Sequence, residues 1–252
     1  MPLSFLSKIA GLFIALTLSA NSHASLSFAI NPNEGGESKP RYLKALTLWL
    51  KDHSCFTEVF VTSNTEKADL IFDIRDRKET PPPQLIVTGL NPNSLDSVWL
   101  VKTARANGGI KAIQSESIGL LNTHSQIGYQ QPWNQLNEAG IFTKDVQVYQ
   151  TDLYQGLMVL LMHGDVYAMA APRVLTTQWQ KNNAISIVAE KSNSLVAGIW
   201  VSPVNSKDKN QRHKIDQCLK AMLSLKRESH RDRKMKVFPE WVNGFEKPAI
   251  RR

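Results

Sequence analysis

Short apolar runs alternate with amphipathic stretches along most of this chain, an order that is typical of α/β proteins. Runs that suit strands lie at 25–30, 58–62, 69–73, 84–88, 97–101, 118–121, 146–149, 165–171, 185–189 and 198–202. Four stretches with helical spacing begin at Pro40, at Ser63 (a short helix), near Tyr129 and after Asp152. Two more cover residues 174–183 and 207–225. The chain therefore opens as strand, helix, strand, short helix, strand, which indicates a parallel α/β layer.

The segment 117–136 joins a buried strand to a helix through a polar loop. Residues 118–121 are apolar, 122–127 are mostly polar, and Gly128 allows a sharp turn before the helix. Such a connection turns the free N–H groups of the helix start towards an anion. On its own, the pattern fits an ordinary strand-to-helix connection as well as it fits an anion site.

Residues 1–24 have the features of a cleavable secretory signal peptide. Lys8 is their only charge, an apolar run covers 9–18, and Ser22-His23-Ala24 places small residues at the cleavage site. The apolar run is too short to span a bilayer, and no cysteine follows it closely, so neither a membrane anchor nor a lipid anchor is expected. We therefore expect an exported, periplasmic protein that begins near Ser25.

The predicted mature chain contains two cysteines, Cys55 and Cys218. In an oxidising compartment they can form one bridge, but two buried thiols fit the sequence equally well because pairing depends on geometry. No grouping of cysteine and histidine has the spacing of a zinc site. The sequence predicts no metal and no cofactor.

Positive charge is concentrated in the last quarter of the chain. The formal net charge is +8, and much of it comes from the basic stretch 226–236 and from Arg251 and Arg252. A basic surface can attract nucleic acid, anionic lipid or acidic ligands. Because the protein is expected outside the cytoplasm, and because Glu228 and Asp232 interrupt the stretch, we predict a solvated helix face and no nucleic-acid partner.

Three motifs in the second half occur in an order known from one family. Residues 125–132 lie where that family has a Ser-Thr-Ser-Gly turn, an aromatic or apolar residue and a helix-opening proline. Residues 139–141 and the strand at 146–149 match its next segment, and 160–172 match the one after, with Tyr167 in place of an aspartate. The chain thus resembles the type II periplasmic substrate-binding proteins of ABC transporters, and within them the phosphate and phosphonate branch.

This resemblance covers residues 97–203 well and the region before them thinly. It implies an α/β fold of two lobes, each a mixed sheet flanked by helices, with a ligand cleft between them. Mapped onto the chain, lobe 1 would comprise 25–102 and 192–252, and lobe 2 would comprise 103–191. The polar segment 102–117, which contains Gly108 and Gly109, suits a crossing between the lobes, and lobe closure would be the functional motion.

The resemblance also implies that four groups of loop residues face the cleft. The candidate ligand-binding residues are Asn33, Glu34, Gly35, Ser63, Asn64, Thr123, His124, Ser125, Gln126, Gly128, Tyr129, Thr151, Asp152 and Arg173. His124 can bind an anion when protonated, and Arg173 can form a bidentate pair with a carboxylate or phosphate. The alternatives remain open: a surface turn for 33–35, helix caps at the serine and threonine positions, and exposed side chains for the histidine and the arginine.

One departure from the family pattern bears on the ligand. Gln126 and Ile127 stand where two further hydroxyl residues are expected, and each lost donor weakens a buried phosphate site by about 1–3 kcal/mol. The ligand class therefore stays open between a phosphate-like or phosphonate-like anion, an amino acid and another solute.

We predict a monomeric binding protein that presents one small polar, anionic ligand to a membrane ABC permease. A periplasmic sensing module for a membrane receptor kinase has the same sequence features. The chain lacks a Gly-x-Ser-x-Gly elbow, a phosphate loop and metal-spaced histidines, and nothing forces Asp152 and His163 into a dyad. A hydrolytic enzyme on the same fold is therefore the weakest alternative, and no catalytic residue is predicted.

Overall fold

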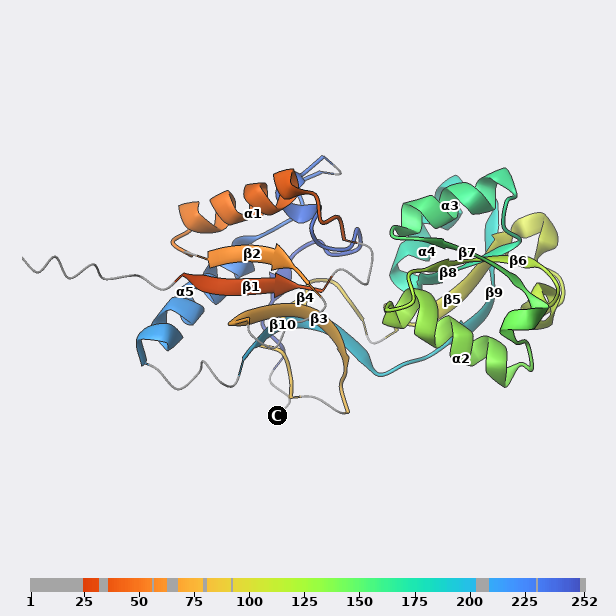
Figure 1. Ribbon diagram of the computed structural model, residues 1–252, viewed down its shortest axis with the longest axis horizontal. Helices are drawn as coiled ribbons and strands as arrows, with labels where there is room; N and C mark the ends of the chain where they lie inside the picture. The colour runs from red at the N-terminus through yellow and green to blue at the C-terminus, as the bar shows by residue number, and fades with distance from the viewer. Residues whose placement is uncertain are drawn as a thin grey trace, which may run out of the picture.

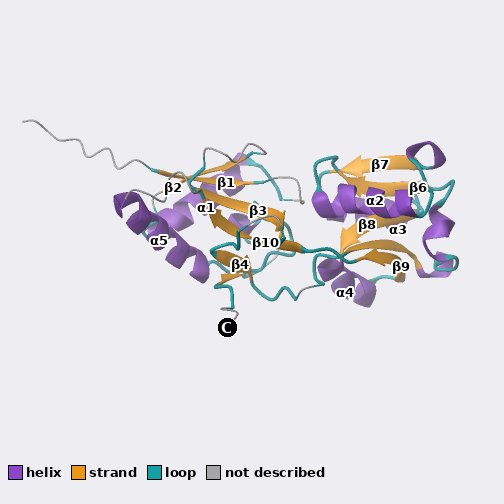
Figure 2. Ribbon diagram, turned by 90° about the horizontal axis from the view of Figure 1, so that it is seen from below, coloured by secondary structure: helices purple, strands orange, loops and turns teal. Residues whose placement is uncertain are grey.

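The protein consists of two α/β lobes that lie side by side, as the computed structural model shows in two views (Figures 1 and 2). The structure describes residues 25–31, 36–55, 57–62, 68–78, 81–91, 93–202, 209–229 and 231–249. The predicted signal peptide, 1–24, and the predicted short helix at Ser63 lie outside these residues. Each lobe is built on one mixed sheet, which agrees with the predicted fold class.

The sheet of the first lobe draws its strands from both ends of the chain. Its strands are β1 (Leu26–Ile30), β2 (Thr57–Val61), β3 (Leu70–Asp76), β4 (Leu85–Val87), β10 (Leu195–Val201) and β11 (Phe245–Glu246). They lie in the order β11-β4-β10-β3-β1-β2. The β1 strand runs parallel to β2 and β3, as the opening pattern of the sequence predicts, whereas β10 is antiparallel to β3 and β4.

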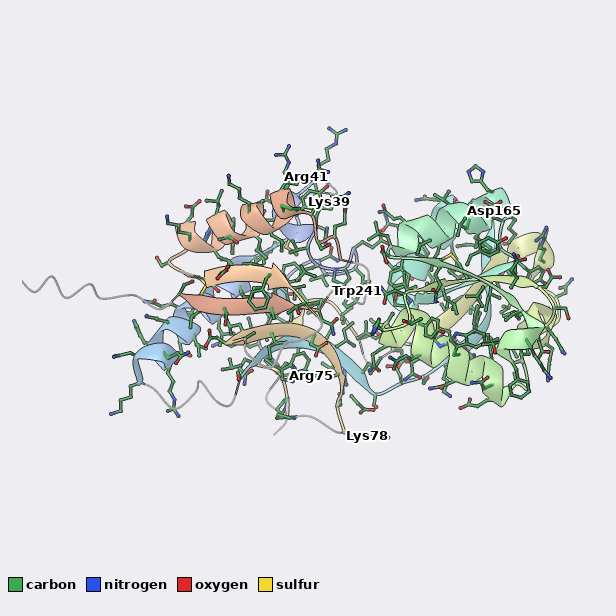
Figure 3. All side chains as sticks on the ribbon, in the orientation of Figure 1. Lys39, Arg41, Arg75, Lys78, Asp165 and Trp241 are labelled. Atoms are coloured by element: carbon green, nitrogen blue, oxygen red, sulfur yellow. A yellow bond between two sulfur atoms is a disulfide. The ribbon has the colours of Figure 1, made fainter. Side chains whose placement is uncertain are left out.

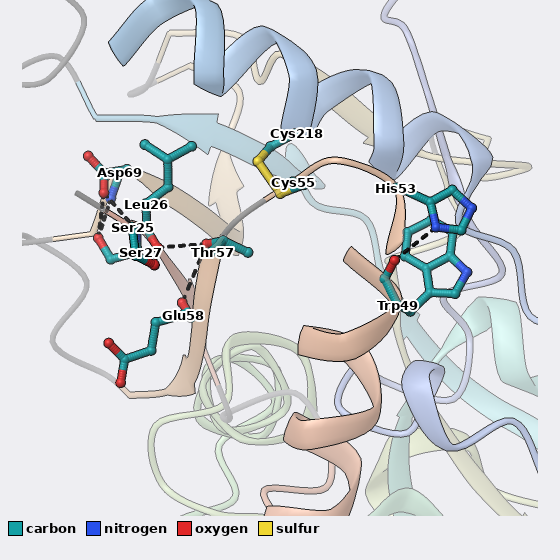
Figure 4. Close-up of a disulfide and its surroundings, with 10 residues drawn as sticks. All are labelled: Ser25, Leu26, Ser27, Trp49, His53, Cys55, Thr57, Glu58, Asp69 and Cys218. Carbon is teal, nitrogen blue, oxygen red and sulfur yellow. Dashed lines mark hydrogen bonds between the residues drawn. A yellow bond between two sulfur atoms is a disulfide. The ribbon is translucent and has the colours of Figure 1, made fainter. Parts of the chain in front are cut away.

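Two helices, α1 (Pro40–Asp52) and α5 (Lys209–Ser224), pack on one face of this sheet. Pro40 opens α1, and the helix buries Leu46 and Leu50 completely. A disulfide between Cys55 and Cys218, 163 residues apart, ties the end of α1 to the middle of α5 (Figure 4). The bridge that the sequence left open is therefore formed.

The second lobe has a sheet in the order β7-β6-β8-β5-β9. Its strands are β5 (Ser97–Lys102), β6 (Ser117–Leu121), β7 (Gln147–Thr151), β8 (Ala168–Pro172) and β9 (Ile185–Lys191). Its helices are α2 (Gln131–Glu138), α3 (Tyr154–His163) and α4 (Arg173–Asn182). Strand β6 runs parallel to β7 and β8, and β5 runs antiparallel to β8 and β9. Helices α3 and α4 pack on one face of this sheet and α2 packs on the other. In Figure 1, α3 lies above the sheet and α2 lies below it.

The polar segment 102–117 does not cross between the lobes, so that prediction is wrong. It forms two short 3-10 helices, Thr103–Arg105 and Gly109–Ile113, that stay in the second lobe. The backbone N–H of Thr103 donates to the carbonyl of Ala184, which precedes β9, at 2.8 Å. Because β5 also pairs within the second sheet, we propose that lobe 2 begins before Ser97 and not after Lys102.

Candidate functional site

The carboxyl ends of the parallel strands in both lobes point towards the space between the lobes (Figures 1 and 2). In the first lobe these are the ends of β1 and β2, and in the second lobe those of β6, β7 and β8. Loops that follow such strand ends are where open α/β sheets bind their ligands. The residues of these loops therefore define the candidate site.

The loop after β6 uses the side chain of Ser125 to hold its own shape. The hydroxyl of Ser125 is completely buried and accepts a hydrogen bond from the N–H of Gly128 at 2.7 Å. It caps one turn of π-helix, Gln126–Gln130, that leads into α2. A side chain on Gly128 would place a Cβ atom 2.7 Å from Cγ of Leu121, so any larger residue there would force Leu121 to shift.

The exposed part of the same loop is formed by Thr123 and His124. The N–H of His124 donates to the side chain of Asn122 at 3.2 Å, and its imidazole lies 3.4 Å from the hydroxyl of Thr123. Gln126 is half-buried, and Tyr129 packs edge-on against Trp133 with the ring centroids 6.2 Å apart. Of the residues predicted in this loop, Thr123 and His124 thus expose their side chains to solvent, whereas Ser125 and Gly128 stabilise the conformation of the loop.

The loop after β7 leads into α3 without a side-chain cap. A helix cap by Thr151 was one of the alternatives that the sequence left open, but the N-cap of α3 is Leu153 and it has no side-chain cap. The hydroxyl of Thr151 donates instead to the carbonyl of Leu153 at 2.8 Å, and Asp152 is exposed. Because Thr151 pairs in register with Leu121, the loops after β6 and β7 start side by side.

Arg173 lies at the start of α4, directly after β8. Its guanidinium forms an ion pair with Glu190 of β9, and its N–H donates to the carbonyl of Asp96 at 2.9 Å. The next N–H, that of Val174, donates to the carbonyl of Ser94. The start of α4 is therefore bound to the chain segment that enters the second lobe, and a ligand contact of Arg173 stays a prediction.

The two crossing segments are bonded to each other through Asp96. This carboxylate is 2% exposed and accepts from the hydroxyl of Ser192 at 3.2 Å and from the N–H of Asn193 at 3.1 Å. The amide of Asn193 donates in turn to the carbonyl of Leu95 at 2.7 Å. The two crossings are thus bonded to each other where they pass between the lobes, which is the arrangement expected of a hinge.

The basic stretch after α5 is not a solvated helix face, so that prediction is wrong. Helix α5 ends at Ser224, and Lys226 forms an isolated bridge with Gly244. The half-buried guanidinium of Arg227 donates to three backbone carbonyls, those of Met235, Pro239 and Val242, at 2.9–3.0 Å. Burial lowers the pKa of Arg227, while the carboxylates of Asp232 and Glu240 act in the opposite direction.

The loop before α1 lies against this C-terminal segment. The N–H of Glu37 donates to the carbonyl of Lys236 at 2.9 Å, and a Cβ on Gly36 would meet the carbonyl oxygen of Val237 at 2.2 Å. The carboxylate of Glu37 pairs with Lys39 at 2.8 Å and with Lys236 at 3.6 Å. The predicted contacts Asn33, Glu34 and Gly35 precede this junction and, like Ser63 and Asn64, lie outside the described residues.

A small cavity of about 30 Å³ lies where the first turn of α3 meets the wall of the first lobe. It is lined by Leu153, Tyr154, Gln155, Glu37, Arg227, Lys236, Phe238 and Glu240. Across it, the amide of Gln155 donates to the carboxylate of Glu240 at 2.8 Å. Figure 3 shows Trp241, the next residue, on the side of the first lobe that faces the second. None of these lining residues was predicted, because they come from segments far apart in the chain.

The described residues show neither a metal site nor a membrane span. In the part of the chain that the structure describes, no three His, Cys, Asp or Glu residues are grouped so that they could hold a metal ion. No helix among the same residues has the length and apolar character needed to cross a membrane.

The paired crossings, the two mixed sheets and the facing strand ends define a two-lobed protein with the type II periplasmic-binding-protein fold. Solved structures agree. PhnD1 from Prochlorococcus marinus, in complex with methylphosphonate, matches with a TM-score of 0.58 and 14% identity, covering 89% of this chain and 93% of PhnD1. A binding-protein component of an ABC phosphonate transporter from Pseudomonas aeruginosa matches with a TM-score of 0.56 and 12% identity, covering 88% of this chain and 81% of the other.

A third similar structure is a protein of Xanthomonas citri bound to ATP, with a TM-score of 0.51, 12% identity and coverage of 89% and 91%. No protein-family model matches the chain, and no curated protein matches it either. At such low identity the structural matches show the fold. They confirm the resemblance to phosphonate-binding proteins and other ABC-transporter binding proteins at that level.

Proposed function

We propose that this protein is an exported, monomeric solute-binding protein that reversibly binds one small anion between its lobes. Export by the predicted signal peptide would place it in the periplasm, where it would deliver the solute to a membrane ABC permease. One observation carries the proposal: the two segments that cross between the lobes are bonded to each other through Asp96, and the cleft beside them has walls from both lobes. This arrangement supports reversible binding by closure of the lobes.

Charge and backbone direction support an anionic solute. The wall of the first lobe carries Arg227 and Lys236 beside Glu37 and Glu240, and the facing edge of the second lobe carries the start of α3. Helix starts and cations both favour negative charge. Thr123, His124, Gln126 and Asp152 would contact the solute from the second lobe, and Ser125 and Gly128 would shape the loop that presents them.

Thermal unfolding of the purified protein in the presence of single solutes tests the proposal. The panel would contain phosphate, methylphosphonate, sulfate, amino acids and dicarboxylates. A solute present at about 100 times its Kd adds about 2.7 kcal/mol to the free energy of unfolding, which raises Tm by about 5–10 °C for a protein of this size. If no solute raises Tm, or if a solute is chemically converted, the binding-protein proposal is overturned.

Two variants locate the site once a solute raises Tm. Thr123→Ala should reduce the ligand-induced rise without changing the Tm of the ligand-free protein, because the hydroxyl is exposed. Thr177→Ala, which removes an exposed hydroxyl from α4, is the matched control and should leave the rise unchanged. An equal effect of both variants would contradict a site at the loop after β6.

A further inference from the structure

A groove of about 630 Å³ lies in the first lobe, away from the cavity between the lobes. It is lined by strand β4, by residues 195–197 of β10, by Pro81–Pro83 and by the segment that enters the second lobe. We call it the β4–β10 groove, and it shares no lining residue with the cavity between the lobes. Its volume lies within the range of about 300–1,000 Å³ that is typical of pockets for small organic ligands.

The interior of the β4–β10 groove is apolar. Its most deeply buried lining residues, each at most 3% exposed, are Val87, Leu95, Leu195 and Ala197. Among the described residues that line the groove, none is an aspartate or a glutamate. A free inorganic anion would lose its hydration there without gaining enough hydrogen-bond donors, and a cation would find no carboxylate. The lining therefore fits an apolar group.

The wall formed by Pro81–Pro83 is held in place by the sheet. The indole Nε1 of Trp200 donates to the carbonyl of Pro81 at 3.0 Å. A Cβ on Gly198 would lie 2.8 Å from Cβ of Pro83, so this proline packs directly on β10. Because each proline also has a fixed φ angle, the wall has little freedom to collapse into the groove.

A second wall is held by the segments that cross between the lobes. The amide of Asn193 donates to the carbonyl of Leu95 at 2.7 Å, and its side-chain oxygen accepts from the N–H of Leu195 at 3.0 Å. Leu95 and Leu195, which both line the groove, are thus fixed through one side chain. The groove is therefore preformed, as sites for small ligands usually are, and its occupant would contact both crossing segments.

The lining of the groove carries one cation, Arg77. Its backbone is fixed, since its N–H donates to the carbonyl of Ser194 at 2.9 Å, whereas its side chain is exposed. Within the described part of the chain, its guanidinium forms no ion pair. The preceding carboxylate, Asp76, accepts instead from the N–H of Lys78 at 2.8 Å and from Ser194. A guanidinium in this state can bind a carboxylate through two parallel hydrogen bonds.

From these observations we propose that the β4–β10 groove is a ligand site, separate from the cleft between the lobes, for a small amphiphile with a carboxylate head. The apolar body of the ligand packs on Leu95, Leu195 and their neighbours, and its carboxylate pairs with Arg77. This site goes beyond the proposed function and does not depend on it, because the two sites share no residue.

Calorimetric titration of the purified protein with octanoate tests the proposal. Octanol, which is neutral, and octylamine, which is cationic, have the same alkyl chain and serve as comparison probes. We expect octanoate to bind at one site per chain and more tightly than octylamine. Absence of octanoate binding, or equal binding of octanoate and octylamine, overturns the proposal.

Three variants locate the bound octanoate. Arg77→Gln should weaken octanoate binding about two- to fivefold and leave octanol binding unchanged, whereas Arg231→Gln, which removes an exposed guanidinium outside the groove, should change neither. Val196→Trp fills the groove and should abolish the binding of both probes, with a thermal scan to check that the variant is folded. Octanoate binding that Arg77→Gln leaves unchanged, or that a folded Val196→Trp retains, overturns the proposal.

The same variants keep this test apart from that of the proposed function. We expect Arg77→Gln to show the same solute-induced rise of Tm in the thermal panel as the unmodified protein. If no solute of that panel raises Tm while octanoate binds as described, the proposed function falls and the groove site stands. If the panel succeeds and octanoate does not bind, the groove site falls alone.

Discussion

Replacing Ser125 with alanine separates the structural and the ligand-binding roles of the loop after β6. The hydroxyl is completely buried and accepts the N–H of Gly128 at 2.7 Å, so its removal leaves that N–H without this bond. Loss of a side-chain cap costs about 1 kcal/mol, and a buried donor without a partner costs about 1–3 kcal/mol. We expect Ser125→Ala to lower the free energy of unfolding by about 1–3 kcal/mol and Tm by about 5 °C.

Differential scanning calorimetry of the ligand-free protein measures this effect. Thr123→Ala serves as the control, because it removes an exposed hydroxyl from the same loop and should leave Tm unchanged. Weaker ligand binding by Ser125→Ala would then follow from a disordered loop. A Tm equal to that of the unmodified protein would refute the capping role and would assign the Ser125 hydroxyl to the ligand.

Three further predictions concern the stability of the fold. Cys218→Ser opens a disulfide that spans 163 residues. The chain-entropy model predicts that the free energy of unfolding falls by about 5 kcal/mol, which lowers Tm by about 10 °C or more. A smaller fall of Tm in a thermal scan would contradict this prediction. Gly128→Ala should lower the free energy of unfolding by about 1–3 kcal/mol, measured by urea denaturation, because its Cβ would lie 2.7 Å from Leu121. An unchanged urea midpoint would show that the loop adjusts to the added methyl group without loss of stability. A hydrogen bond from Ser194 holds the pKa of Asp76 below its usual value. This carboxylate therefore stabilises the fold at neutral pH, and the contribution is lost as pH falls through the lowered pKa. Asp76→Asn should accordingly be less stable than the unmodified protein at pH 6 and equally stable at strongly acidic pH, as pH-dependent thermal scans can check.

The strands and most helices of this protein follow from local sequence patterns. Apolar runs bounded by turn residues marked β1, β3 and β9, and Pro40 marked the first residue of α1. The wrong prediction that segment 102–117 crosses between the lobes has a local cause. Gly108 and Gly109 adopt φ angles of 99° and 58°, which the sequence signals as a turn, but a turn does not reveal whether the chain leaves its lobe.

The basic stretch after α5 was misinterpreted because its partners are distant. Arg227 bonds to carbonyls 8, 12 and 15 residues further along the chain, a spacing without helical or strand period. The cavity between the lobes could not be predicted for the same reason, since Gln155 and Glu240, which meet across it, are 85 residues apart in the chain. Strand order could therefore indicate which loops face the cleft, whereas the residues that meet across it depend on the tertiary structure.

The central claim is that one small anion binds between the lobes, and native mass spectrometry tests it most directly. The purified protein would be equilibrated with a metabolite extract, exchanged into volatile buffer and measured without denaturation. The account predicts a single added mass of one small anion per chain, which disappears when the protein is unfolded. A spectrum that contains only the bare chain, or a graded series of added masses in place of one, would contradict it.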